Sequence, residues 1–280
     1  MKASHLTALA FLLPFTCFAQ KLPTDSMLLI SLRKDFDAVD KFSPAPQFRW
    51  LDLNTAPDSS MLSTTDVAEL IARAKGKRVL LLIHGMNTPA VRAINYYRGV
   101  AHWVNGPTAP YDVVFGLLWP GYQLKRSKVQ ASLAFLKANP SARRSGKKFA
   151  GLLQELAGEA RSLDIMTHSM GSKVALSALK KQDGMVDKLF LMAPSVGAKT
   201  LGKHRKYEAS ARHVRDKAVV FFSNNDPVFR ALGKKMMGYQ GMVSKKPLPE
   251  DKFLNIDCSE AVYRHSAYWS SQQVFEVLEH

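Results

Sequence analysis

The chain has few cysteines and few acidic residues for its length. Its 280 residues include only Cys17 and Cys258, and 23 acidic residues stand against 39 lysines and arginines. The sequence has no H-E-x-x-H run and no cysteine cluster, and His204 and His213 lack partners at metal-ligand spacing. Glycine-rich phosphate loops and dinucleotide fingerprints are absent as well. We therefore expect no metal and no cofactor.

Long apolar runs are absent except near the N-terminus. Lys2 supplies a positive start, residues 6–15 an apolar centre, and residues 17–19 a small-x-small cleavage site. This run contains Pro14 and is shorter than the roughly 20 apolar residues that a spanning helix needs. We expect residues 1–19 to be a cleaved signal peptide, so that the protein is periplasmic or secreted. A lipid anchor on Cys17 is the alternative.

Residues 20–280 then contain one cysteine, Cys258, and cannot form an intrachain disulfide. We expect them to fold as a single domain held by a hydrophobic core, because 46% of the chain is hydrophobic. The formal net charge of +16 favours an anionic membrane or envelope surface as partner, or is simply a well-solvated surface. We expect no nucleic-acid partner, because no aromatic-interleaved basic motif appears. The composition leaves the oligomeric state unknown.

Strand-like and helix-like segments alternate along the chain, which predicts an α/β fold with a mostly parallel central sheet and helices on both faces. An edge hairpin is expected first, from two short extended runs that flank Pro44 and Pro46. Central strands and helices follow, and residues 122–139 are a candidate lid. The expected strands are 27–32, 47–53, 78–83, 113–119, 163–167, 188–192, 218–223 and 253–257. The expected helices are 65–75 with a cap at Ser63 or Thr64, 89–104, 141–160, 171–181 and 266–278.

The most informative stretch is T-H-S-M-G at residues 167–171, where an apolar run ends in Ser169 and a helical pattern follows. A serine hydroxyl is a poor nucleophile unless it is held exposed beside a base, and a tight strand-to-helix turn provides that exposure. Small residues are needed two positions on either side, and Gly171 meets this need better than Thr167. A helix N-cap is the alternative role of Ser169.

An earlier strand ends in His84-Gly85-Met86-Asn87. Because Gly85 removes bulk there, the N–H of Met86 is a candidate oxyanion donor, and the N–H of Met170 is the second. His84 is more consistent with a structural hydrogen-bonding role than with a base.

A base and a group that orients it are also available. Asp226 follows the strand at 218–223, and His265 follows the last strand, in the order Ser, Asp, His. Turn formation is the alternative role of Asp226, and a helix start or a surface position is the alternative for His265. Asp257 is a distant alternative to Asp226.

These motifs resemble those of the α/β-hydrolases, and most closely a bacterial subgroup of serine hydrolases without an assigned substrate. Members share H-G-x-N, a Trp-Pro strand end, T-H-S-M-G, an S-x-N-D-type loop and a terminal His-Ser-x-Tyr. The resemblance covers residues 78–280 and implies Ser169 as nucleophile, His265 as general base and then acid, and Asp226 as the residue that fixes the imidazole tautomer. Thr167 departs from the glycine of the wider family, and Ser195 stands where an acid is expected.

The resemblance leads us to expect cleavage of a small-molecule or lipid carboxylic ester through an acyl-enzyme. Acyl transfer, a version directed at envelope lipids, and a binding protein without turnover are the alternatives. Apolar side chains near the motifs line an acyl pocket or belong to the core: Met86, Trp119, Phe229, Met236, Met237 and Met242.

Overall fold

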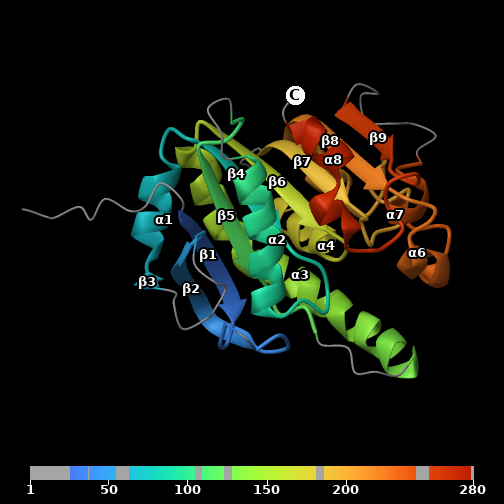
Figure 1. Ribbon diagram of the computed structural model, residues 1–280, viewed down its shortest axis with the longest axis horizontal. Coiled ribbons are helices and arrows are strands. Elements are labelled where there is room, and N and C mark those ends of the chain that lie inside the picture. The colour runs from blue at the N-terminus through green and yellow to red at the C-terminus, as the bar shows by residue number, and fades with distance from the viewer. Residues whose placement is uncertain are drawn as a thin grey trace, which may run out of the picture.

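A single twisted sheet runs through the protein, as the alternating pattern predicts (Figure 1). The computed structural model describes residues 26–36, 38–54, 63–104, 109–122, 128–180, 186–243 and 252–278, so the predicted signal peptide lies outside them. Among these residues nine strands pair in the order β3-β2-β1-β5-β4-β6-β7-β8-β9. The strands are β1 (Ser26–Arg33), β2 (Phe42–Asp52), β3 (Ser63–Thr65), β4 (Arg78–Ile83), β5 (Val113–Leu118), β6 (Ser162–His168), β7 (Val186–Met192), β8 (Val214–Phe222) and β9 (Phe253–Asp257).

The sheet is mostly parallel, which confirms the predicted class. Every pairing from β1 across to β9 is parallel, and only the pairs that β2 makes with β1 and β3 are antiparallel. The apolar run of β4 shows why: Val79, Leu81 and Ile83 pack into one core layer, while Leu80 and Leu82 pack into the other. A strand buried on both faces needs this continuous apolar sequence.

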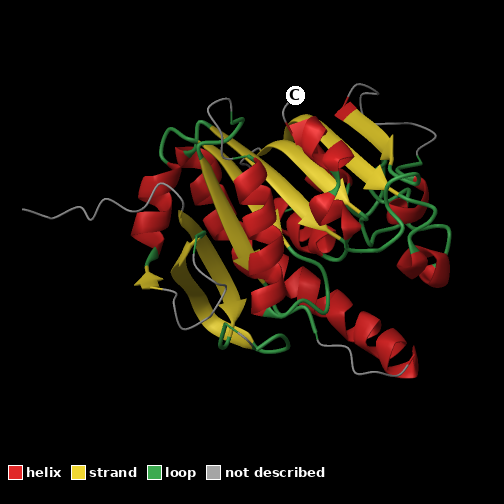
Figure 2. Cartoon of the chain, viewed as in Figure 1, coloured by secondary structure: helices red, strands yellow, loops and turns green. Residues whose placement is uncertain are grey.

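Helices cover both faces of the sheet (Figure 2). Side chains of α1, α3, α4 and α5 pack into the first core layer, and those of α2, η3 and α8 into the second. None of the described helices is long and apolar enough to cross a membrane. The helices are α1 (Val67–Ala74), α2 (Ala90–Trp103), α3 (Lys128–Glu159), α4 (Gly171–Leu179), α5 (Glu208–Arg212), α6 (Pro227–Leu232), α7 (Met237–Gln240), η3 (Ala267–Ser270) and α8 (Gln272–Leu278).

The N-terminal expectations need correction. Pro44 and Pro46 lie inside β2, beside the irregular register between Ser31 and Arg33, where a missing N–H is tolerated. The hairpin is not wholly at the edge either, because β1 also pairs with β5. The cap of α1 is Asp66, whose carboxylate accepts from the N–H of Glu69, and not Ser63 or Thr64.

Most of the candidate lid at residues 122–139 is helical, and the helix expected from residue 141 begins earlier. Helix α3 begins at Lys128 and continues through Pro140, although proline removes one intrahelical hydrogen bond. The N-terminal end of α3 projects beyond the sheet (Figure 1). The expected helix at 266–278 is instead two pieces, η3 and α8, which separate at Ser271.

Candidate active site

Ser169 occupies a sharp turn between β6 and α4. Its φ is +52°, a left-handed backbone conformation that residues other than glycine rarely adopt. Its N–H donates to the carbonyl of Met192 at 2.9 Å. A Cβ at Gly171 would lie 2.6 Å from the backbone oxygens of Ile83 and His84, so only glycine lets the start of α4 approach β4 this closely. Thr167 is accommodated because its buried side chain faces β7, with the hydroxyl 3.4 Å from the carbonyl oxygen of Phe190.

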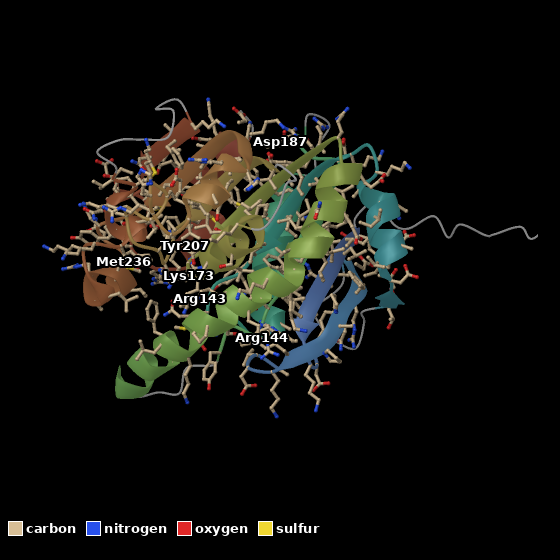
Figure 3. All side chains as sticks on the ribbon, turned by 180° about the vertical axis from the view of Figure 1, so that it is seen from behind. Arg143, Arg144, Lys173, Asp187, Tyr207 and Met236 are labelled. Carbon is tan, nitrogen blue, oxygen red and sulfur yellow. The ribbon has the colours of Figure 1, made fainter. Side chains whose placement is uncertain are left out.

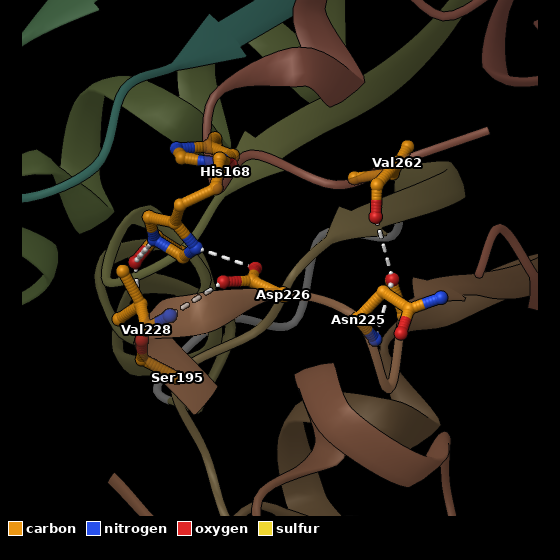
Figure 4. A network of polar contacts seen from close by, with 9 residues as sticks. His168, Ser195, Asn225, Asp226, Val228 and Val262 are labelled. Carbon is orange, nitrogen blue, oxygen red and sulfur yellow. Dashed lines mark hydrogen bonds and ion pairs between the residues drawn. The ribbon is translucent and has the colours of Figure 1, made fainter. Parts of the chain in front are cut away.

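The structure brings Ser169, His265 and Asp226 together at the carboxyl ends of the strands. Oγ of Ser169 lies 2.9 Å from Nε2 of His265, and Nδ1 of His265 lies 2.7 Å from Oδ2 of the fully buried Asp226 (Figure 4). A carboxylate accepts only, so Nδ1 carries the proton and Nε2 is free to accept from the serine hydroxyl. Such an arrangement can serve as a nucleophile, a base and an orienting acid.

Asp226 has two roles at once. While Oδ2 faces His265, Oδ1 accepts from the N–H of Val228 at 2.9 Å and caps α6 (Figure 4). The turn role expected as an alternative is therefore present beside the contact with the histidine. Two further bonds tie this loop to the segment before His265: Oγ of Ser223 donates to the carbonyl of Val262 at 2.8 Å, and Nδ2 of Asn225 to that of Ser259 at 2.9 Å.

The two candidate oxyanion donors flank the serine turn. A Cβ at Gly85 would lie 3.1 Å from Cβ of Ser169 and 2.9 Å from Nδ1 of His168, so the loop that carries Met86 touches the turn. Neither the N–H of Met86 nor that of Met170 has a hydrogen-bond partner among the residues that the structure describes. The hydrogen-bonding capacity of both groups is thus unused within the described chain.

His84 has a structural role. Its ring is fully buried, Nδ1 donates to the carbonyl of Gly85 at 2.6 Å, and Nε2 faces a guanidinium nitrogen of Arg33 at 3.0 Å. Burial and then the charge of Arg33 hold the pKa of His84 well below its usual range, so the ring stays neutral. Asn87 completes the loop with a φ of +57° and an N–H that donates to the carbonyl of Tyr122 at 3.0 Å.

Two contacts of the site were not predicted. Nε2 of His168 donates to the carbonyl of His265 at 2.6 Å. Ser195, noted only as the wrong residue for an acid, places its Oγ 3.1 Å from Oγ of Ser169 and donates its N–H to the Ser169 carbonyl. No spacing signal marks His168, whereas the strand end before Ser195 is a position from which a side chain reaches the site.

The other candidates are placed elsewhere. Asp257 accepts from the N–H and hydroxyl of Ser259 and has no contact with His265. His204 and His213 lie in turns around α5, and the described residues hold no group of three potential metal ligands. Of the candidate pocket residues, Trp119, Phe229 and Met237 are core, whereas Met86, Met236 and Met242 are partly buried.

Three solved structures are similar to this chain at low sequence identity. An α/β-superfamily hydrolase from Xanthomonas campestris pv. campestris is 14% identical, with a TM-score of 0.39 over 72% of this chain and 96% of that one. Esterase PE8 is 13% identical, with a TM-score of 0.43 over 74% and 92%. The zinc-bound structure of a cold-adapted esterase from an Arctic intertidal metagenomic library is 14% identical, with a TM-score of 0.44 over 84% and 86%.

One curated relative is similar over a shorter stretch. The transmembrane and coiled-coil domain-containing protein STS1 of Oryza sativa subsp. japonica is 26% identical over 144 residues, which are 49% of this chain. The chain spans 21% of that protein's length.

A family model described as an α/β hydrolase of unknown function (DUF900) matches residues 59–236, which include β4 to β8, the serine turn and Asp226. His265 lies beyond the matched segment. Because this match covers more than half of the sequence, the chain belongs to that family of α/β hydrolases.

Proposed function

We propose that this protein is an exported serine hydrolase that cleaves carboxylic esters through an acyl-enzyme. The observation that carries the proposal is the pair of contacts of His265, 2.9 Å to Ser169 and 2.7 Å to Asp226, beside a serine with a φ of +52°. An ordinary helix cap needs neither a base nor a strained backbone. The proposal includes membership of the bacterial subgroup of serine hydrolases, and it is supported by the resemblance of the H-G-x-N, T-H-S-M-G and His-Ser-x-Tyr motifs to that subgroup.

The first half-reaction depends on the tautomer of His265 in which Nδ1 carries the proton and Nε2 is free. Ser169 attacks the ester carbonyl carbon as Nε2 of His265 takes its proton, while Asp226 stabilises the imidazolium that forms. The N–H groups of Met86 and Met170 donate to the oxyanion, and the positive end of α4 favours its charge. Collapse of this intermediate breaks the ester bond, and His265 returns the proton to the leaving alcohol.

The second half-reaction repeats these steps with water. His265 removes a proton from water as the oxygen attacks the acyl carbon, and the proton then passes to Oγ of Ser169. The carboxylic acid leaves and the serine is regenerated. No metal or cofactor takes part in this scheme.

A fluorophosphonate probe tests the proposal. The protein without residues 1–19 is treated with the probe beside Ser169→Ala, and the adduct is located by mass spectrometry. We expect stoichiometric labelling at Ser169 and none in the variant, with ester turnover reduced on the order of 10⁴-fold or more in that variant. A well-folded protein that is not labelled would overturn the proposal and favour a binding protein on the same fold.

Export forms a separate part of the proposal. It is supported by Lys2, the apolar centre and the cleavage site before Gln20. Cell fractionation of the full chain, with the N-terminus of the product sequenced, is expected to give a periplasmic or secreted protein that begins at Gln20. Retention of residues 1–19 in a cytoplasmic product would contradict this part alone.

A further inference from the structure

Positive side chains gather where α3, α4 and the segment before α5 meet. Arg143 of α3, Lys173 of α4 and Lys206 lie close enough that the charges of Arg143 and Lys206 act on Lys173, and that of Arg143 acts on Lys206. Figure 3 shows Arg143, Lys173 and Tyr207 next to one another on this side of the molecule. No carboxylate of the described chain forms an ion pair with any of the three cations.

Lys173 is the fixed member of this cluster. Its ammonium is partly buried, donates to Oδ1 of Asn139 and lies 5.0 Å from the centroid of the Phe135 ring. Burial, and then the charges of Lys206 and Arg143, lower the pKa of Lys173 to about 8. An amide oxygen and a ring face compensate a full charge only in part, so the ammonium retains an unused capacity to bind an anion.

Tyr207 supplies an independent observation. The residue is 3% exposed, and its hydroxyl lies near the side chain of Ser177 without forming a well-aligned hydrogen bond. Nζ of Lys206 lies 5.2 Å from the centroid of its ring. Burial raises the pKa of the phenol, and the contact with Ser177 and then the charge of Arg143 oppose that rise. A buried hydroxyl whose one neighbour is poorly aligned retains the capacity to bind a further group.

The cluster lies near the candidate active site. Lys173 lies in the first turn of α4, which begins two residues after Ser169. The ammonium of Lys173 is directed toward α3, where it meets Asn139 and Phe135.

We propose that Arg143, Lys173 and Lys206, with the hydroxyl of Tyr207, form a binding site for a phosphate group. A guanidinium, two ammonium groups and a hydroxyl offer more donors than the two oxygens of a carboxylate accept well, whereas a phosphate has at least three acceptor oxygens and up to two negative charges. The site binds its ligand without any covalent step and does not depend on the proposed hydrolysis.

Binding of inorganic phosphate tests the site directly. The melting temperature and calorimetric titration of the wild-type protein are compared in phosphate and in chloride at equal ionic strength. We expect phosphate to raise the melting temperature in a saturable way that chloride does not reproduce. An equal effect of both salts would overturn the proposal, because it would show only screening of a basic surface.

Matched variants separate a specific site from diffuse charge. Arg143→Gln and Arg144→Gln change the same charge on the same helix, but the guanidinium of Arg144 lies 4.5 Å from the Phe42 ring centroid instead (Figure 3). We expect Arg143→Gln and Lys173→Met each to weaken phosphate binding about tenfold or more, and Arg144→Gln to leave it unchanged. Equal losses in Arg143→Gln and Arg144→Gln would refute the site, and this exposed pair decides the question even where Lys173→Met does not fold.

Vesicles identify the source of the phosphate group. Phosphatidylcholine vesicles with and without phosphatidic acid are incubated with wild type, Arg143→Gln and Arg144→Gln. Capture by phosphatidic acid that depends on Arg143 but not on Arg144 would support the site with a lipid headgroup as ligand. Binding of inorganic phosphate with the same dependence, but no capture on vesicles, would support the site with a soluble phosphate-bearing ligand.

Discussion

The imidazole of His168 donates a hydrogen bond to the carbonyl oxygen of His265, 2.6 Å away, although 97 residues separate the two in sequence. The two rings also pack at a centroid distance of 4.7 Å. The residue that precedes the proposed nucleophile therefore holds the backbone of the proposed base. This contact couples the serine turn to the histidine loop.

Replacing His168 by Phe is expected to lower kcat about tenfold or more with a smaller change in KM. Phenylalanine keeps a ring but removes the donor, so His265 is held less well for proton transfer. The measurement is ester turnover together with the rate of fluorophosphonate labelling. If both rates match the wild type in a folded variant, His168 does not position His265.

Acid is expected to destabilise the fold from about pH 6.5 downward. Burial, and then the charge of His265, lower the pKa of His168 to about 3, so the unfolded chain takes up a proton there before the native protein does. Stability is therefore lost as the pH falls from about 6.5 to about 3, with a slope of up to about 1.4 kcal/mol per pH unit from this group. Urea unfolding at several pH values measures the slope. It should become shallower in His168→Phe, and an unchanged slope would contradict the assignment.

Because the two oxygens of Asp226 have different partners, Asp226→Asn and Asp226→Ala are expected to differ in their effects on turnover and stability. Asp226→Asn keeps an oxygen that caps α6 but no longer orients the proposed tautomer of His265, so we expect turnover to fall on the order of 10³-fold at nearly constant melting temperature. Asp226→Ala also loses the cap and should cost about 1 kcal/mol of stability in addition. Kinetics and thermal unfolding of both variants distinguish these roles. Unchanged turnover in Asp226→Asn would remove Asp226 from the triad.

Replacing Ser195 by Ala is expected to lower turnover less than replacing Ser169 by Ala. Because the proton of Ser169 faces His265, the hydroxyl of Ser195 is the donor in their 3.1 Å contact and restrains the rotamer of Ser169. Ser195→Ala should lower turnover about fivefold, which corresponds to about 1 kcal/mol for one hydrogen bond. Stoichiometric labelling of Ser169 should persist. A loss as large as that of Ser169→Ala would contradict a restraining role.

Two glycines provide a test of the close approach between α4 and β4. Gly171→Ala places a methyl group 2.6 Å from backbone oxygens and should destabilise the fold by several kcal/mol or prevent folding. Gly99→Ala in α2 meets nothing within 4 Å and should stabilise the protein by about 0.5–1 kcal/mol. Chemical denaturation measures both. Equal stability of the two variants would show that the start of α4 does not approach β4 closely enough to require glycine at position 171.

The sequence by itself determined the sheet and the chain positions of the proposed triad. Continuous apolar runs such as residues 78–83 predict buried parallel strands, and such strands bring their carboxyl ends to one edge. Ser169, Asp226 and His265 each follow a predicted strand, so their convergence could be expected. The family match independently agrees with that architecture.

Only the tertiary structure decided which groups touch. Helix α3 runs through Pro140, and Pro44 and Pro46 lie within β2, because packing and pairing outweigh local preference at these positions. The contacts of His168 with His265, of Ser195 with Ser169, and the grouping of Arg143, Lys173 and Lys206 join residues whose sequence spacing has no period or motif. Their proximity depends on how α3 and α4 pack on the sheet and on where the loops end, which no local pattern encodes.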